Sequence, residues 1–275
     1  MKVKTKKIKA YKNKLCIRFT KDNCVEKMKK ANDWFISWFN SKYYHILYSD
    51  RNEDEANKFI KFIVSKLSLK LDDKVLDLGC GNGRHSVSLS EYFREVDGID
   101  ISNENILLAS KNKKNNLSFY LSDMRNFKTK NIYGYIFNLF TSFGYFDNKN
   151  DNIKVLKSCH NHLKKNGLIL IDFLNAEKIK TSNSELKEIK IIDQIKFEIT
   201  KKIVGDFITK EIIVFDGELK FKFSEKVQLF GLDEFKTMFK AAGFEIIETF
   251  GDYYMNTYNL NSNRLILVAK KIKHD

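Results

Sequence analysis

The stretch that most constrains this fold is the segment KVLDLGCGNGRHS, residues 74–86, in which a short apolar run leads into three glycines. The apolar run suits a strand that is buried on both faces of a parallel sheet. The glycines, Gly79, Gly81 and Gly83, lack the side chains that would keep a ligand from the backbone. Residues 84–92 are expected to form a helix whose first N–H groups face the same space. The segment therefore predicts a site for an anionic or strongly polar small molecule.

The glycine spacing and the next two strands narrow the type of ligand. The dinucleotide fingerprint has a third glycine five positions after the first, but Arg84 stands there in this chain. A second predicted strand, residues 95–99, ends on Asp100, whose carboxylate can accept both hydroxyls of a ribose. A third strand, residues 118–121, is followed by Ser122, Asp123 and Met124. An enzyme that uses a nicotinamide dinucleotide is therefore the least favoured alternative.

Three segments resemble, in order, the first three motifs of class I S-adenosylmethionine-dependent methyltransferases: VLDLGCGNGRHS, VDGIDIS and LSDM. The resemblance runs from Trp34 to Ile272. It implies a Rossmann-like α/β fold with a seven-stranded, mostly parallel sheet, helices on both faces and an antiparallel last strand. It also implies S-adenosyl-L-methionine as the cofactor and methyl transfer as the reaction.

The resemblance also implies a set of cofactor-binding residues. Asp77 and Arg51 would meet the amino and carboxylate ends of the methionine moiety. Asp100 would bind the ribose, and Asp123 with Met124 the adenine. Cys80 is expected to be a small residue with a useful backbone N–H, not a nucleophile. The full set is Arg51, Asp77, Gly79, Cys80, Gly81, Asn82, Gly83, Asp100, Ile101, Asp123, Met124 and Asn138.

Aromatic residues before the first motif predict part of the active site. The segment YYHILYSDR resembles the cofactor-covering segment of small-molecule N- and O-methyltransferases, including amino-sugar N-methyltransferases. By that resemblance Tyr44 and Tyr48 would wall the site, and with Tyr145 they are the predicted catalytic residues, ranked ahead of His45. No covalent nucleophile is expected, because holding the reactants in line supplies much of the catalysis. The aromatic residues just upstream are expected to be core: Trp34, Phe35, Trp38 and Phe39.

A fourth strand, residues 135–140, carries Asn138 and is followed by TSFGYF. Enzymes that methylate nucleobase amino groups often have Asn or Asp, two prolines and an aromatic residue here, whereas this chain contains no proline. The segment looks instead like that of small-molecule methyltransferases. Ligands bind at the carboxyl ends of strands in open α/β sheets, so Asn138 and Tyr145 should border the site.

The second half of the chain interrupts the alternation of strands and helices. A helix over 152–163, a turn over 164–167 with positive φ at Gly167 and a strand over 168–174 are predicted first. Period-2 stretches then predict three antiparallel strands at 189–200, 202–215 and 218–230. A helix over 232–242 and strands at 244–250 and 264–270 complete the core. We expect four parts: a basic arm (1–30), a cofactor-binding core with N-terminal cap helices (31–175), an inserted β lid or dimerisation element (176–230) and the end of the core (231–275).

The formal net charge of +14 raises nucleic acid as a partner. Residues 1–30 contain 12 Lys/Arg and two acidic residues, so the remaining 37 basic and 33 acidic residues leave +4 elsewhere. Lysine excess and the missing proline favour an AT-rich genome, over selection for RNA binding, as the source of the positive charge. A small-molecule acceptor is therefore preferred, with N-, O- and C-methylation left open. An RNA or protein methyltransferase that uses the basic arm is the main alternative, and a cofactor-binding protein without catalysis is another.

Membrane insertion and a metal site are not expected. No apolar run has the length of a membrane span, and the four cysteines lack metal spacing. His160 and His162 are two residues apart and do not share a helical face. Unspaced cysteines suggest a reducing compartment and a cytoplasmic location, and the protein is expected to be a monomer or homodimer.

Overall fold

Strands that are apolar on both faces form the centre of a seven-stranded sheet. The computed structural model describes residues 34–50, 53–182 and 185–272. The sheet order is β10-β11-β5-β4-β1-β2-β3, in which β11 is antiparallel to both of its neighbours. The predicted fold class is confirmed. The seven strands are β1 Lys74–Leu78, β2 Glu95–Asp100, β3 Leu117–Leu121, β4 Tyr133–Asn138, β5 Leu163–Leu174, β10 Phe244–Phe250 and β11 Arg264–Lys271.

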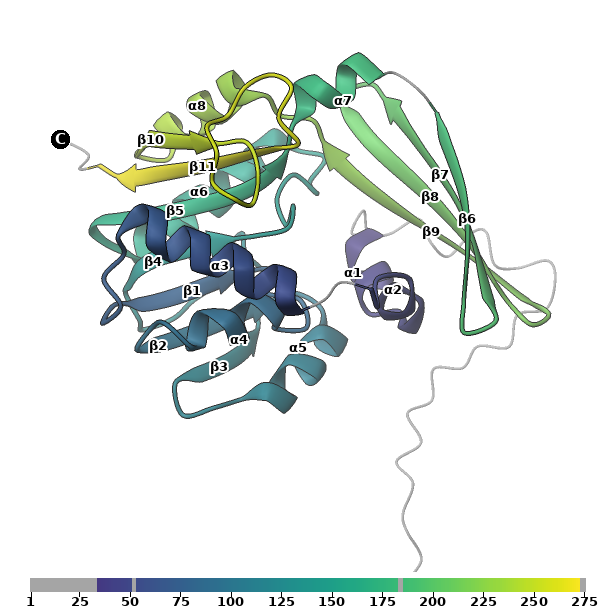
Figure 1. The fold of residues 1–275 in the computed structure, drawn as a ribbon, viewed down its shortest axis with the longest axis horizontal. Coiled ribbons are helices and arrows are strands. Elements are labelled where there is room, and N and C mark those ends of the chain that lie inside the picture. Colours follow the sequence, from purple (N-terminus) through teal and green to yellow (C-terminus); the bar gives the residue numbers. More distant parts are fainter. Residues whose placement is uncertain (1–33, 51–52, 183–184, 273–275) are drawn as a thin grey trace, which may run out of the picture. The chain divides into compact units, whose positions relative to one another are not determined.

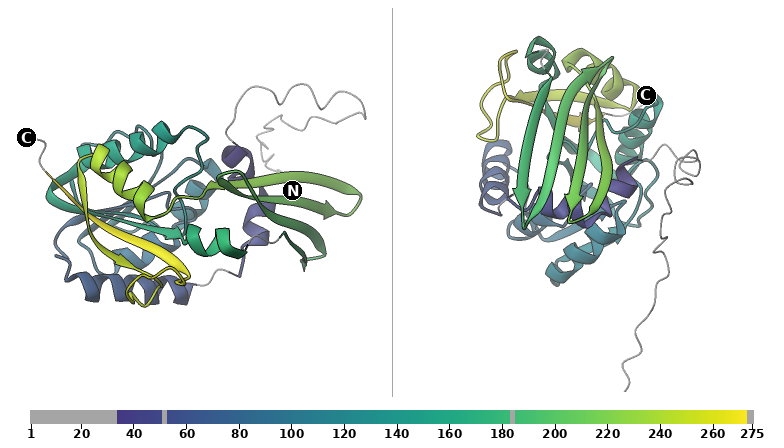
Figure 2. Two further views of the ribbon diagram at one scale, coloured as in Figure 1. Left: turned by 90° about the horizontal axis from the view of Figure 1, so that it is seen from above. Right: turned by 90° about the vertical axis from the view of Figure 1, so that its right-hand side faces the viewer.

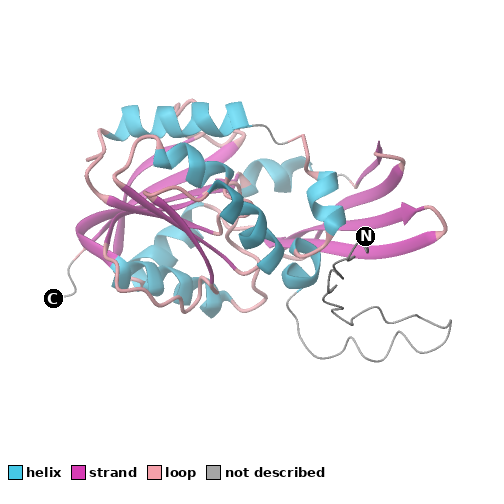
Figure 3. Ribbon diagram, turned by 90° about the horizontal axis from the view of Figure 1, so that it is seen from below, coloured by secondary structure: helices cyan, strands magenta, loops and turns pink. Residues whose placement is uncertain are grey.

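Helices cover both faces of this sheet (Figure 3). The apolar side chains are buried in two separate clusters. One cluster includes residues of α6 and α8, and the other includes residues of α3 and α4. Ser102 caps α5, since its side chain accepts a hydrogen bond from the Asn105 N–H. The bounds are α3 Glu53–Leu67, α4 Arg84–Ser90, α5 Asn103–Ala109 with a 3₁₀ turn Ser110–Asn112, α6 Lys149–His162 and α8 Leu232–Ala241.

Two predictions around β4 and β5 were wrong in detail. β4 ends at Asn138, because Phe140 and Thr141 adopt left-handed φ values of 58° and 62° that a strand does not allow. The segment predicted as a turn belongs to β5, where the pairing with β4 shifts register. Its positive φ of 62° is at Asn166, not at Gly167. A Cβ on Gly167 would lie 3.0 Å from the Gly134 carbonyl oxygen, so this glycine allows close packing of the two strands.

The inserted sheet has four antiparallel strands, in the order β6-β7-β8-β9 (Figures 1 and 2). The prediction of three strands was wrong because residues 189–200 contain a turn at Asp193 and Gln194, which have positive φ without any glycine. Gly205 and Gly217, which also have positive φ, lie in the other two turns of this sheet. A helix that was not predicted, α7 Ala176–Ser182, precedes the sheet. The strands are β6 Leu186–Ile192, β7 Ile195–Val204, β8 Phe207–Asp216 and β9 Leu219–Gln228.

The aromatic segment before the first motif forms two short helices, α1 Trp34–Phe39 and α2 Lys42–Leu47, and packs on the inserted sheet. This contact is a third hydrophobic cluster, which includes Trp38, Tyr43, Phe197 and Ile212. The indole Nε1 of Trp38 also donates to Glu225 Oε1 at 2.8 Å. The helices and the inserted sheet therefore form one packed unit, although over a hundred residues separate them.

The expectation that the upstream aromatics are core residues holds for two of the four. Phe35 and Trp38 are buried. Trp34 and Phe39 are half-buried and line the cavity described below. Within the described residues, no helix is both long and apolar enough to span a membrane.

Candidate functional site

A cavity of about 830 Å³ lies where the turn after β1, the ends of β2 and β5 and the loop after β4 come together. Helices α1 and α2 line another side, and the inserted sheet contributes residues of β7, β8 and β9. Ligand pockets for small molecules have roughly 300–1,000 Å³. The inserted sheet is thus a wall of this cavity and not a remote appendage.

The glycine turn is fixed against the end of β2. The backbone N–H groups of Gly79 and Cys80 both donate to the Ile99 carbonyl oxygen, at 2.8 and 2.9 Å. Gly81 has a φ of +56°, and a Cβ there would have no atom within 4 Å, so the turn opens into free space at this residue. Gly79, Cys80, Gly81 and Asn82 line the cavity.

Gly83 has a different role from the other two glycines. It is not among the cavity-lining residues. A Cβ at Gly83 would lie 2.8 Å from the Phe119 ring of β3, and the residue is the N-cap of α4 with a φ of +87°. Its missing side chain therefore serves the packing of α4 on the sheet.

Asp77, in β1, is a buried carboxylate on the cavity wall. Burial raises its pKa to about 7, although a hydrogen bond from the Ser86 hydroxyl favours the ionised form. The negative charge of Asp100 raises it further. A cation that entered the cavity would stabilise the ionised form of Asp77.

Asp100 is the last residue of β2 and organises the backbone around it. One oxygen accepts the Gly81 N–H at 2.9 Å. The other accepts the Ser102 N–H at 2.8 Å and Nδ2 of Asn105 at 3.2 Å. Burial raises the pKa of Asp100, and these donors oppose that rise. Each carboxylate oxygen has several acceptor sites, so Asp100 can still accept ligand hydroxyls. Asp100 and the next residue, Ile101, both line the cavity.

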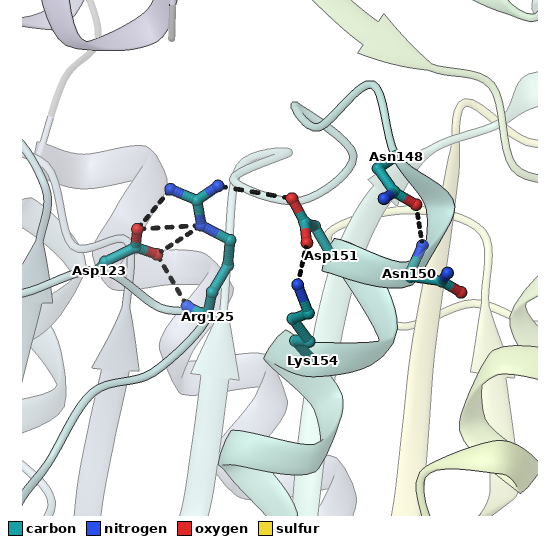
Figure 4. A network of polar contacts seen from close by, with 6 residues as sticks. All are labelled: Asp123, Arg125, Asn148, Asn150, Asp151 and Lys154. Atoms are coloured by element: carbon teal, nitrogen blue, oxygen red, sulfur yellow. Dashed lines mark hydrogen bonds and ion pairs between the residues drawn. The ribbon is translucent and has the colours of Figure 1, made fainter. Parts of the chain in front are cut away.

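Asp123 and Met124 also line the cavity, and Asp123 is held by Arg125 (Figure 4). The Arg125 Nη2 and Nε atoms lie 2.6 and 2.9 Å from Asp123 Oδ2, and the Arg125 backbone N–H donates to Oδ1 at 2.8 Å. The guanidinium also lies 3.5 Å from Asp151 and covers the Phe146 ring. The sequence analysis missed Arg125, for which the Asp-x-Arg spacing was the available signal.

Two residues of the predicted cofactor set stand apart. Asn138 is buried and does not line the cavity; its Nδ2 donates to the Leu78 carbonyl oxygen at 2.7 Å, which ties the ends of β4 and β1 together. Arg51 lies outside the described residues.

The three predicted tyrosines come together with other aromatic residues on one side of the cavity. The Tyr145 ring packs edge-on against Trp34, with centroids 5.3 Å apart. Tyr44 contacts Phe39 at 5.0 Å and Tyr48 at 5.1 Å. His45 lines the same side, and burial lowers its pKa. We call this set the aromatic wall: Trp34, Phe39, Tyr44, His45, Tyr48 and Tyr145.

The hydroxyl of Tyr48 is bound to residues of the inserted sheet. It donates to Glu225 Oε1 at 2.5 Å, and the Lys210 ammonium contacts the same hydroxyl. Lys210 and Glu225 also form an ion pair at 3.5 Å. Both residues line the cavity. The sequence analysis missed them, because no local pattern links strands of the insert to a helix more than 150 residues upstream.

A family model for a methyltransferase domain matches residues 69–243, more than half of the chain. The chain belongs to the class I S-adenosylmethionine-dependent methyltransferases. YqeM of Bacillus subtilis (strain 168) is 28% identical to this methyltransferase over 242 residues, 84% of this chain and 95% of YqeM. The glycine/sarcosine N-methyltransferase of Aphanothece halophytica is 27% identical over 236 residues, 80% of this chain and 83% of that enzyme. The structure of the CcbJ methyltransferase from Streptomyces caelestis superposes with a TM-score of 0.73 at 16% identity and covers 86% of this chain and 98% of CcbJ.

A second family model, for tRNA (uracil-5-)-methyltransferases, matches residues 5–125 of this methyltransferase. The match contains the three cofactor motifs and ends before β4. It includes the tyrosines of α2 but none of the residues that α7 and the inserted sheet contribute to the cavity. The cavity residues from β4 onward thus lie outside this similarity.

Proposed function

We propose that this enzyme transfers the methyl group of S-adenosylmethionine to a small-molecule acceptor. The observation that carries the proposal is the cavity itself, whose sides away from the glycine turn are formed by the aromatic wall and the inserted sheet. Such an arrangement favours a ligand that is enclosed over one that is bound along a surface. The similarity to a glycine/sarcosine N-methyltransferase supports the same class of acceptor.

The cofactor-binding side of the cavity fits S-adenosylmethionine, which supplies an electrophilic methyl group when bound. Open space at Gly81 would admit the methionine moiety, and the ionised Asp77 would pair with its amino group. Asp100 would accept the ribose hydroxyls, and Asp123 with Met124 would contact the adenine. Asn138 would act indirectly, by holding β4 to β1. We keep Arg51 as the partner of the carboxylate.

Among the predicted catalytic tyrosines, Tyr48 is the strongest candidate to take a proton from the acceptor. The Tyr48 hydroxyl donates a hydrogen bond to Glu225. When its oxygen takes a proton from the acceptor, the hydroxyl can pass its own proton to the Glu225 carboxylate. The Lys210 ammonium stabilises negative charge on the phenolic oxygen. Tyr44 and Tyr145 would orient the acceptor with their rings.

The inserted sheet acts as a lid in this proposal. Five of its residues line the cavity, while its packing on α1 and α2 fixes Tyr48 and Tyr44 in place. The lid therefore carries part of the site, and we expect acceptor choice to depend on it. A cytoplasmic location agrees with Cys80 and Cys159, which are free thiols.

Methyl transfer to RNA is the second candidate, favoured by the partial match to tRNA methyltransferases. One experiment separates the two. The full chain is incubated with S-adenosylmethionine labelled in its methyl group and with small-molecule and RNA fractions of the source cell. Label in the small-molecule fraction supports the proposal, and label confined to RNA contradicts it. Removing residues 1–30 should leave small-molecule methylation unchanged but should reduce RNA methylation and its salt dependence.

A further inference from the structure

We propose that the acceptor carries an oxyanion, a carboxylate or phosphate, which docks on Arg264 in a cavity that Lys178 and Lys201 also line. This inference rests on the proposed small-molecule function and specifies its acceptor. All three basic residues line the cavity, and they come from β11, α7 and β7. They are separated in sequence, so only the fold brings them to one site.

Arg264 is held in a fixed orientation by two neighbours. Its Nε donates to Asp172 Oδ1 at 2.7 Å, and its Nη2 donates to Thr141 Oγ1 at 2.8 Å. Nη1 has no partner among the described residues, so its two N–H groups are available to a ligand. The Arg264 side chain is 18% exposed, whereas Asp172 beside it is fully buried. A guanidinium oriented in advance loses little entropy when it binds a planar oxyanion.

The buried ion pair and the strained backbone around Arg264 lower the stability of the fold. Their presence therefore indicates a role in function. Asp172 is fully buried, and buried ion pairs seldom stabilise a fold relative to apolar residues. Phe140 and Thr141 hold left-handed φ values that L-residues avoid, and their N–H groups donate to the Oδ2 atom and the carbonyl oxygen of Asp172 at 2.9 and 3.0 Å. Backbone strain of this kind concentrates at ligand sites.

The charge of this part of the cavity is positive. Asp172 neutralises Arg264, and Glu225 neutralises Lys210. Lys178 donates to Asn263 Oδ1 at 2.7 Å but has no carboxylate partner in the described part of the chain, and neither does Lys201. Two positive charges therefore remain on the acceptor side, where an anion would complete the pairing.

The cofactor's own carboxylate is a poorer occupant of this position. Arg264 starts β11, which is separated from β1 by β5 and β4. At three strand spacings, β11 and β1 lie roughly 14 Å apart in the sheet. Lys178 and Lys201 belong to α7 and the inserted sheet, away from the glycine turn that would receive the methionine moiety.

A chromatographic assay tests the proposal. The small-molecule extract is separated on an anion exchanger, and the flow-through and retained fractions are each offered to the full chain with methyl-labelled S-adenosylmethionine. We expect label in the retained, anionic fraction. Label only in the flow-through would overturn the anionic acceptor while leaving small-molecule methylation intact. Label only in RNA would remove the proposed function itself, and this inference with it.

Two adjacent lysines provide a matched pair of variants. Lys201 lines the cavity, whereas Lys202 points to the other face of β7 and is not a lining residue. When the retained fraction is supplied at a limiting concentration, Lys201→Gln should lower the methylation rate roughly fivefold. At a saturating concentration the methylation rate should be preserved. Lys202→Gln should match the parent protein. Equal behaviour of the two variants would contradict the proposal.

Arg264→Lys tests whether Arg264 binds the oxyanion of the acceptor or the carboxylate of the cofactor. Calorimetry with S-adenosylhomocysteine, which keeps the methionine carboxylate, should give unchanged affinity while turnover of the retained fraction falls. A clear loss of S-adenosylhomocysteine affinity would instead assign Arg264 to the cofactor and overturn the proposal. If this variant does not fold, the Lys201 and Lys202 pair still decides.

Discussion

Ser86, in the first turn of α4, donates its hydroxyl proton to the buried carboxylate of Asp77 in β1 across 2.5 Å. The bond links the two ends of the glycine turn, and a hydrogen bond from the Ser86 backbone also favours the ionised carboxylate. Burial nevertheless raises the pKa of Asp77 to about 7. The cavity therefore presents a carboxylate whose ionised form is disfavoured by burial until a cation binds beside it.

Asp77→Asn should stabilise the cofactor-free protein at high pH. The pKa of Asp77 rises from 3.8 in the unfolded chain to about 7 in the fold. The folded state thus binds the proton more tightly, and its stability falls as pH rises from about 4 to 7 and then stays low. The loss can reach roughly 4 kcal/mol. Asn keeps the Ser86 hydrogen bond without the charge, so the gain in melting temperature over the parent should be larger at about pH 8 than at about pH 5. A gain independent of pH would contradict this assignment.

The same residue should link cofactor binding to proton release. If the cofactor's amino group pairs with ionised Asp77, affinity for S-adenosylhomocysteine falls about tenfold per pH unit below 7 and levels off above it. Calorimetry in buffers with different ionisation heats measures the released proton directly. Asp77→Asn should lose roughly a hundredfold in affinity and release no proton. Unchanged affinity in this variant would remove Asp77 from the cofactor site.

Arg125→Gln should weaken cofactor binding without unfolding the protein. Arg125 holds both oxygens of Asp123, which we place against the adenine (Figure 4). Without this charge-assisted contact, Asp123 can rotate, and S-adenosylhomocysteine affinity should fall roughly tenfold. Lys154→Gln is the control, because Lys154 is in the same network and, among the described residues, pairs with Asp151 and not with Asp123. Equal effects of the two variants would show that the network acts on stability alone.

Gly81→Ala should separate backbone strain from obstruction of the ligand. Gly81 and Gly217 have φ values of 56° and 59°, and a Cβ at either meets no atom within 4 Å. Alanine at either position should therefore cost about 1 kcal/mol of stability. Only Gly81 lines the cavity, so only Gly81→Ala should also weaken S-adenosylhomocysteine binding severalfold in calorimetry. Retained affinity in that variant would remove the turn from the ligand site.

The sequence predicted the features that local patterns encode. The apolar run of β1, the glycine turn and the carboxylate ending β2 led to the fold class, which is confirmed, and to residues that line one cavity, because strand order and ligand position are linked in open α/β sheets. Turn chemistry failed where residues other than glycine took positive φ. This happened at Asn166 and at the pair Asp193 and Gln194. Because the turn at Asp193 and Gln194 was missed, β6 and β7 were predicted as one strand.

The side of the cavity formed by the aromatic wall and the inserted sheet was harder to predict, because its contacts are long-range. Glu225 and Lys210 reach Tyr48 from the inserted sheet, and Asp172 fixes Arg264 across 92 residues. Each of these residues has an ordinary local context. No spacing or periodicity marks them, so the tyrosines could be named from a resemblance while their partners could not.

Tyr48→Phe should lower turnover and leave cofactor affinity unchanged. Removing the hydroxyl removes the proton acceptor that Glu225 and Lys210 support, and general-base contributions are roughly a hundredfold or more. Glu225→Gln should have a similar effect, and the double variant should be no slower than either single variant, because both act through one proton path. Tyr43→Phe is the matched control: Tyr43 is in α2, for which Tyr48 is the C-cap, and donates to Asp216 at 2.9 Å, but it does not line the cavity. Additive losses in the double variant, or a comparable rate loss in Tyr43→Phe, would show that Tyr48 and Glu225 position the lid and do not move a proton.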